Sequence, residues 1–254
     1  MTETSAPTLL TLPLLSEAGV KHGFTTLAAG DMSWSALQTD AGWRNFEAVC
    51  GPLGLSARDT ITAEQVHGTM VAVAHLCENC GPGNRIPHTD GLITEEPWPL
   101  MVVVADCYPV ILYEPRAPML ALVHCGWRGT TGGILPRAVA RLQRESGGAA
   151  RDVLAGIGPG ICAGCYQAGG EVADAARRAG LAEHLAPDAE VSRWRFDVAG
   201  ALRQQLHECG LQPSHIETLG RCNFEDVSLP SHRRDGTSVR AAAIAALESR
   251  PLLR

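Results

Sequence analysis

Residues 105–133, ADCYPVILYEPRAPMLALVHCGWRGTTGG, combine two apolar segments with a cysteine and a histidine that could carry chemistry. The two short apolar segments are PVILY and MLALVH, and they are separated by EPRAP, whose two prolines predict a turn. A third apolar run, LMVVVADC at residues 100–107, comes just before them and predicts a buried strand because it is continuous and β-branched. Cys107 and His124 therefore lie at the ends of predicted strands, and the question is whether they pack or carry chemistry.

The rest of the chain adds one more strand and several helices. VLAGIG at residues 153–158 predicts a fourth strand, and helical patterns occur in ILPRAVARLQRES, EVADAARRAG and DVAGALRQQLHECG. The last pattern is the clearest, with Asp197 as its N-cap and Gly210 as its stop. Glycine and proline are spread evenly, without repeats or a low-complexity linker. We therefore expect one domain over residues 1–254, of the α+β class, with mixed strands and helices in layers.

Composition excludes several functional classes. The chain has 254 residues and a net charge of −6, and it lacks the basic stripe that nucleic-acid binding requires. The N-terminus does not resemble a signal peptide, and no segment reaches the roughly 18 apolar residues of a membrane span. We expect a cytoplasmic protein with a small-molecule substrate and neither nucleic acid nor membrane as a partner. Nine cysteines in that setting indicate buried thiols, metal binding or catalysis.

Three side chains with metal-binding chemistry lie where a predicted strand ends or a turn begins. They are His67 in EQVHGTM, Cys107 in VVVADC and His124 in LALVHCGWRG. Imidazole and thiolate are preferred zinc ligands, and three protein ligands leave a fourth position open, as in catalytic zinc sites. Taken singly, each of the three residues fits a packed or surface side chain better than a metal ligand, because free cysteine is commonly buried. Together they predict about one zinc ion per chain.

Two C-x-x-C pairs compete as metal sites, Cys77/Cys80 and Cys162/Cys165. They lie about 80 residues apart, whereas a zinc ribbon needs a separation of about 15–20, so we expect no metal site shared between them. The glycine-rich stretch GIGPGI, residues 156–161, lacks the lysine of a P-loop and predicts a tight turn that lines a pocket.

SHRRDG near the C-terminus pairs Arg233 and Arg234 with Asp235. Two interpretations stay open for this segment. It could be a solvated turn, or it could bind an anion or fix a carboxylate through its arginines.

The combined motifs resemble those of a known family. EQVHG, TDGLIT, VVADCYPVILYEP, ALVHCGWRGTTGGI, AGIGPGI followed by CY and GGEV, and SHRRDG occur in the order and spacing of the YfiH-type family. This family is also called the laccase-domain or multicopper polyphenol oxidase family, and the peptidoglycan editing factor family. The resemblance extends from about His22 to Asp235, and the pair formed by ADC-x-PV and H-x-GWRG is its most specific part.

The resemblance implies a fold, a metal and a reaction. The implied fold is a single-domain layered α/β sandwich with mixed sheets. The implied centre is a His–Cys–His zinc site, carried over to His67, Cys107 and His124 as metal and catalytic residues, with copper as the other possible metal. The implied activity is that of a purine nucleoside phosphorylase or adenosine deaminase, acting on adenosine and inosine by phosphorolysis, deaminating adenosine, and cleaving methylthioadenosine.

Residues around this centre are expected to bind the nucleoside and phosphate: Asn45, Gln65, Asp106, Arg128, Arg233 and Arg234. The chain also departs from the family pattern. Leu27 and Phe46 stand where the resemblance would place arginines, and the usual glycine before the last arginine is replaced in TSVR. Each lost charged hydrogen bond would cost about 1.5–3 kcal/mol of phosphate affinity, so we expect weak phosphate binding.

Three other functions remain open from the sequence. The first is a laccase-like copper oxidase of phenols, although the nine histidines form no H-x-H pair, which multicopper oxidases usually have. The second is a cysteine hydrolase or amidase that edits a peptidoglycan precursor, with Cys107 as nucleophile and His124 as base. The third is a zinc-binding scaffold without catalysis.

Overall fold

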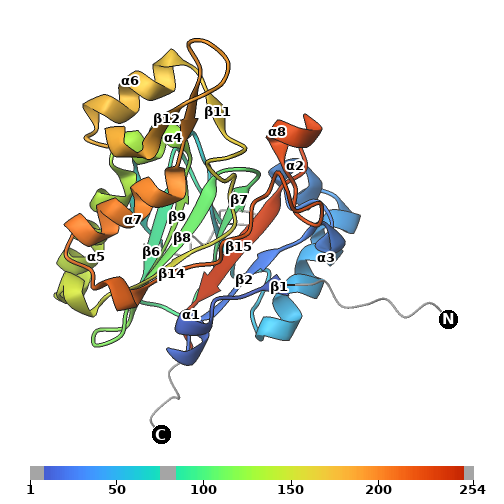
Figure 1. Cartoon of the computed structure of the whole chain (residues 1–254). Coiled ribbons are helices and arrows are strands. Elements are labelled where there is room, and N and C mark those ends of the chain that lie inside the picture. Colours follow the sequence, from blue (N-terminus) through green and yellow to red (C-terminus); the bar gives the residue numbers. More distant parts are fainter. Residues whose placement is uncertain (1–8, 75–83, 249–254) are drawn as a thin grey trace, which may run out of the picture.

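Two six-stranded sheets pack face to face, and helices cover their outer faces (Figure 1). The computed structural model describes residues 9–74 and 84–248. The strand order of the first sheet is β1 (Leu9–Leu10), β2 (Lys21–Thr25), β15 (Ala241–Ala246), β7 (Leu100–Val104), β3 (Ile61–Ala63), β5 (Arg85–Ile86). The order of the second is β14 (Ile216–Thr218), β10 (Leu154–Ile157), β8 (Tyr108–Glu114), β9 (Met119–Cys125), β6 (Gly91–Thr94), β4 (Val71–Val73). A small third sheet has the order β11 (Gln167–Ala168), β13 (Trp194–Phe196), β12 (Leu185–Pro187).

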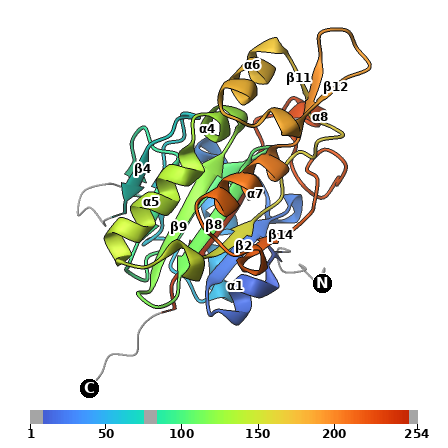
Figure 2. The ribbon, with the colours of Figure 1, turned by 60° about the vertical axis from the view of Figure 1, so that its left-hand side comes forward.

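Helices lie on both outer faces of the sandwich. In chain order the α-helices are α1 (Pro13–Glu17), α2 (Trp34–Leu37), α3 (Asp40–Cys50), α4 (Trp127–Thr131), α5 (Ile134–Ser146), α6 (Gly170–Arg178), α7 (Val198–Glu208) and α8 (His232–Asp235). Short 3-10 turns are η1 (Leu27–Ala29), η2 (Gly51–Leu53), η3 (Ala150–Asp152), η4 (Ala182–His184) and η5 (Pro213–His215). Helix α3 covers the first sheet, while α5 and α7 cover the second, as Figure 2 shows for β8 and β9.

Alternation along the central strands builds the core between these layers. In β9, Leu120 and Leu122 face the other sheet, whereas Ala121 and Val123 face the helices. A strand buried on both faces reads as one continuous apolar run, which is why MLALVH lacks polar residues until His124. Strand β15 consists of alanines and one isoleucine, so it presents little bulk to its neighbours on either face.

The expected fold is confirmed: the chain forms mixed sheets in a single α+β domain. Strands β7 to β10 and helices α5 to α7 fall on the segments that the sequence predicts. The Asp197 side chain caps α7 by accepting the backbone N–H of Gly200 at 2.9 Å, and Gly210 follows the helix with φ +94°. No helix within the two described ranges is long and apolar enough to cross a bilayer.

The chain crosses from one sheet to the other at the point where the chemistry-bearing residues lie. Strand β7 ends at Val104 in the first sheet and β8 begins at Tyr108 in the second, so Asp106 and Cys107 form the crossover. Asp106 has φ +77°, a left-handed conformation that is uncommon for a residue other than glycine. In the β8–β9 ladder Pro109 pairs with His124, which brings His124 close to Cys107.

We expect that Asp197→Ala destabilises the fold by about 1 kcal/mol, because the first turn of α7 loses its side-chain acceptor. Urea unfolding measures this loss. Asp174→Ala is the matched control, since Asp174 pairs with Arg177 on the exposed face of α6 and should change stability by no more than about 0.5 kcal/mol. Equal losses in the two variants would contradict the capping role.

Candidate metal centre and its pocket

Three potential metal ligands converge at the crossover. The ligand atoms of His67, Cys107 and His124 all lie within 4.8 Å of one another. The two imidazole rings meet edge to face, with 4.9 Å between their centroids and 82° between their planes. Gly126 makes this convergence possible, because a Cβ there would lie 3.0 Å from the Cys107 sulfur and 3.2 Å from the His67 ring. The sequence prediction that these three residues come together agrees with the structure.

Asp90, fully buried just before β6, holds two of the ligands in place. Its Oδ1 lies 2.8 Å from Nδ1 of His124 and accepts the backbone N–H of His67 at 3.0 Å. Its Oδ2 accepts the N–H groups of Val66 and Gly68, at 3.2 and 2.7 Å. His67 has φ +58°, so the loop curls around the carboxylate and directs successive N–H groups at it.

The contact with Asp90 also determines which nitrogen of His124 is available to a metal. Because Nδ1 is bonded to the carboxylate, Nε2 is the nitrogen that remains free to coordinate a metal among Cys107 and His67. A carboxylate behind a histidine ligand fixes its tautomer and ring orientation and raises its basicity, an arrangement common in zinc sites.

Cys107 and His124 form a charged pair before any metal ion binds. Burial favours the neutral thiol, but the charge and hydrogen bonding of His124 and His67 outweigh burial and lower the pKa of Cys107 to about 6. Burial also favours the neutral imidazole, but the Cys107 thiolate and the Asp90 carboxylate raise the pKa of His124 to about 9. Thiolate is the form of cysteine that binds metal, and a metal ion that bound here would displace the second proton of the His124 ring.

A cavity of about 470 Å³ opens over the three ligands. This volume lies in the range of small-molecule sites. Besides the three ligands, its walls are formed by Gln65, Val103, Ala105, Asp106, Trp127, Ile161, Tyr166, His232, Arg233 and Arg240. The cavity thus combines aromatic faces with positive charge beside the thiolate and imidazoles.

The SHRRDG segment fixes the carboxylate of Asp106, which is one of the two roles left open for it. Asp106 accepts the Ser231 hydroxyl and the Arg233 backbone N–H, both at 2.7 Å. The Arg233 side chain lies over the Tyr166 ring, 5.3 Å from its centroid, and donates to the carbonyl of Gln167 at 2.8 Å. One arginine of the segment therefore lines the cavity while its backbone holds Asp106.

The other residues expected around the substrate lie in different places. Gln65 lines the cavity, but its side-chain amide exchanges two 2.7 Å hydrogen bonds with the backbone of Val103. Arg234 donates to backbone carbonyls of residues 223–229 and to Asp235, outside the cavity lining. Arg128 stacks on Trp127 and borders a neighbouring depression, and Asn45 lies in α3 next to Gly30. Substrate contacts of these four residues stay predictions.

The positions where the family resemblance would place arginines are not cavity positions in this chain. Phe46 is buried in the core between α3 and the first sheet, and Leu27 lies in η1, outside the cavity lining. Arg240, the arginine of TSVR, does line the cavity, and its Nη1 donates to the carbonyls of Thr237 and Val239.

The sequence motifs did not predict Asp90 as a functional residue, nor the cavity residues Trp127, Tyr166, His232 and Arg240. A signal for Asp90 exists in TDGLIT, where an aspartate directly precedes an apolar strand.

The glycine-rich turn contributes only Ile161 to the cavity, because Gly158 and Gly160 pack tightly against Phe24, Pro109 and Tyr108. The pair Cys77/Cys80 lies outside the described residues, whereas Cys162 and Cys165 lie beside Cys222.

Comparison with known proteins identifies the family. The family model described as multi-copper polyphenol oxidoreductase laccase matches residues 31–248. The chain belongs to this family. The resemblance drawn from the motifs is thereby confirmed, and the matched residues include the ligand set, the crossover and the SHRRDG segment.

The similar proteins cover most of the chain. A purine nucleoside phosphorylase of Deinococcus radiodurans is 34% identical over 94% of each chain, and purine nucleoside phosphorylase YlmD of Geobacillus stearothermophilus is 35% identical over 72% of this chain and 70% of its own. The crystal structure of YlmD from Geobacillus stearothermophilus superposes with a TM-score of 0.85 and 28% identity, covering 98% of both chains. A hypothetical protein YfiH of Bacillus licheniformis superposes with a TM-score of 0.87 and 25% identity over 97% of this chain and 98% of that one.

We expect that Asp90→Asn weakens zinc binding by about 10- to 100-fold, because His124 loses the carboxylate that orients it. Competition with a chromogenic chelator measures the zinc affinity. The control is Glu171→Gln, which alters an exposed carboxylate at 3.7 Å from Arg128 and should leave the affinity unchanged. An unchanged affinity in Asp90→Asn would show that the carboxylate does not support the site.

In chelator-treated protein, we expect Cys107 to react with iodoacetamide at half its maximal rate near pH 6, since its pKa is lowered to about 6. Below that pH the thiolate takes up a proton and the rate falls. Peptide mass spectrometry assigns the label to Cys107, and buried Cys125, whose thiol pKa is raised by burial, is the internal control. A half-point near pH 9 would contradict the charged pair, and added zinc should protect Cys107.

Proposed function

We propose that this chain is a zinc-dependent enzyme that cleaves purine nucleosides by phosphorolysis. The observation that supports it is a His–Cys–His donor set at the floor of a cavity that also holds two arginines and two aromatic side chains. The names of the Deinococcus radiodurans and Geobacillus stearothermophilus relatives support the same reaction class. Adenosine deamination and cleavage of methylthioadenosine are the further reactions proposed for this cavity.

The donor set fits zinc. Two imidazoles and one thiolate are soft to borderline ligands, and the thiolate is favoured before any metal arrives. His67, Cys107 and His124 would hold the ion, with Asp90 behind His124. A zinc ion there would supply a Lewis acid with one open position for water or a phosphate oxygen. Copper also accepts this donor set, so zinc is the proposal and copper its alternative.

The arginines are suited to hold phosphate. Arg233 and Arg240 both line the cavity, and each is anchored through backbone carbonyls at one nitrogen, which leaves further N–H donors on the same guanidinium. Guanidinium binds phosphate oxygens through paired hydrogen bonds. Asp106 positions Arg233 by accepting its backbone N–H, so we assign Asp106 as a positioning residue.

The aromatic walls are suited to hold the base. Trp127 and Tyr166 line the same cavity and offer flat faces against which a purine ring can stack. Burial raises the pKa of Tyr166 to about 12, so its hydroxyl stays protonated at neutral pH and can donate a hydrogen bond. In phosphorolysis, a phosphate oxygen forms a bond to C1′ of the ribose while the bond from C1′ to the purine nitrogen breaks. The electron pair leaves with the base, which takes up one proton.

A second function is favoured by one specific observation. Cys107, His124 and Asp90 form a connected thiolate, imidazole and carboxylate, the arrangement of a cysteine hydrolase. A cysteine hydrolase requires the Cys107 thiolate to act as nucleophile without a metal bound to it. Turnover that survives chelation and is abolished by iodoacetamide would establish the hydrolase and contradict the zinc enzyme.

We expect adenine release from adenosine to depend on phosphate and to saturate only at millimolar phosphate, because Arg233 and Arg240 each already donate from Nη1 to backbone carbonyls. Inosine formation should not depend on phosphate, and it should exceed adenine at low phosphate. Chromatography of adenosine, inosine and adenine with and without phosphate measures both reactions. Adenine release that does not respond to phosphate would contradict phosphorolysis.

We expect Arg240→Ala to raise the KM for phosphate by at least about tenfold, as loss of one charged hydrogen bond costs about 1.5–3 kcal/mol, while the KM for adenosine changes less. The matched control is Arg137→Ala, since Arg137 lies on helix α5 and outside the cavity lining. An equal rise in both KM values would show a general structural effect and not phosphate binding.

A further inference from the structure

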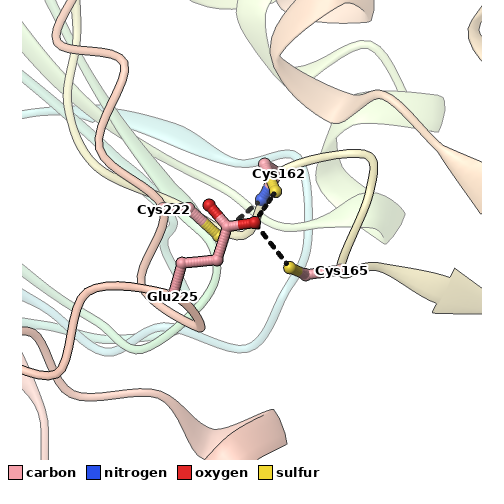
Figure 3. Close-up of side chains that lie close together, drawn as sticks. All are labelled: Cys162, Cys165, Cys222 and Glu225. Carbon is pink, nitrogen blue, oxygen red and sulfur yellow. Dashed lines mark hydrogen bonds between the residues drawn. The ribbon is translucent and has the colours of Figure 1, made fainter.

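A second cluster of metal-binding side chains lies away from the His–Cys–His centre. The ligand atoms of Cys162, Cys165, Cys222 and Glu225 all lie within 4.8 Å of one another (Figure 3). The sulfur atoms of Cys162 and Cys165 lie 3.8 and 3.4 Å from Oε1 of Glu225. Cys222 is 7% exposed, the other two thiols are half-buried, and Glu225 is exposed, so the cluster can be reached from solvent.

The four residues come from two turns of the same spacing. Cys162 and Cys165 form C-x-x-C, and Cys222 and Glu225 form C-x-x-E. In each turn the first cysteine's carbonyl accepts a backbone N–H from further along, Cys165 N–H at 3.0 Å in one and Asp226 N–H at 2.9 Å in the other. Two ligands three residues apart in a tight turn, repeated on two segments, is the pattern of structural zinc sites, here with a carboxylate as the fourth ligand.

Backbone pairing holds the two turns together. Gly160 and Cys222 form an isolated parallel β-bridge, in which the Gly160 N–H donates to Arg221 at 3.3 Å and the Asn223 N–H donates to Gly160 at 3.2 Å. A side chain at position 160 would collide with the Tyr108 ring, at 2.6 Å from an added Cβ. The fold therefore brings the cysteines together without relying on a bond between their sulfurs.

The sulfur of Cys222 is surrounded by donors suited to a thiolate. It accepts the backbone N–H of Cys162 at 3.3 Å, and the N–H groups of Phe224 and Glu225 also point at it. Backbone N–H groups directed at a ligating sulfur are the outer contacts that orient thiolate ligands in metal sites. Three thiols and a carboxylate packed together otherwise offer one another only weak hydrogen bonds.

We propose that Cys162, Cys165, Cys222 and Glu225 bind a second zinc ion. Four protein ligands fill a tetrahedral shell and leave no open position, so this site is structural. Zinc–sulfur distances of about 2.3 Å place tetrahedral ligands about 3.8 Å apart, so the cluster needs to contract by no more than about 1 Å. The chain then carries two zinc ions, one more than the ligand motifs alone predict.

The second ion stabilises a wall of the cavity. Ile161 and Tyr166, which line the cavity, flank the first turn directly. The second turn is bound by Arg234, whose guanidinium donates to the carbonyls of Asn223 and Phe224 at 2.7 and 3.2 Å, and Arg233 is its neighbour. Zinc at the cluster would therefore hold together the two segments that carry Tyr166 and Arg233.

Metal analysis of variants tests the proposal. Protein purified without added metal or chelator should contain two zinc ions per chain by elemental analysis, and Cys165→Ala should contain one. Cys107→Ala should also retain one, which separates this site from the centre under the cavity. The matched control is Cys209→Ser, a half-buried thiol outside the cluster, which should retain both. Wild-type zinc content in Cys165→Ala would overturn the proposal.

Two further measurements keep the test decisive if Cys165→Ala does not fold. Glu225→Cys, which completes a set of four thiolates, should fold and release its second zinc to a chelator more slowly than wild type. In Cys107→Ala, cobalt should produce intense thiolate-to-cobalt charge-transfer absorption. Absence of that band would overturn the proposal. A wild-type protein that lacks the second zinc, and whose mass is two hydrogens lower because these cysteines form a disulfide, would also overturn it.

Discussion

The carboxylate of Asp90 is the contact on which the centre depends. It lies fully buried and accepts three backbone N–H groups from residues 66–68 while bonding the ring of His124. Those contacts outweigh the cost of burial and keep the pKa of Asp90 below its usual value. One buried charge thus shapes the His67 loop, orients His124 and, through His124, favours the thiolate of Cys107.

The arrangement of the two sheets explains why Cys107, His124 and Asp90 lie close together. Cys107 lies where the chain passes from the first sheet to the second, His124 lies near the end of β9, and Asp90 directly precedes β6. Adjacent strands β8, β9 and β6 bring these three to one edge through backbone pairing alone. Side chains placed by strand register are held rigidly, which would suit the proposed binding of a metal and a substrate.

Much of the fold and the three potential metal ligands could be predicted from the sequence. The residues that were not predicted were missed for physical reasons. Continuous apolar runs identify β7 to β10, and the cap at Asp197 identifies α7, because these signals are local. Asp90 was missed because its role arises from backbone groups of a loop more than twenty residues away. Cys222 was missed for the same reason: its partners at 162 and 165 are separated from it by about 60 residues, and an isolated bridge between Gly160 and Cys222 brings them together.

We propose that zinc binds between the sulfur of Cys107 and the rings of His67 and His124, with Asp90 behind His124. Anomalous diffraction at the zinc absorption edge, on crystals grown without added metal, tests it directly. We expect an anomalous peak within bonding distance of the Cys107 sulfur, the His124 Nε2 atom and the His67 ring. A map with no peak there, in crystals where Cys107 is intact and unmodified, would contradict it.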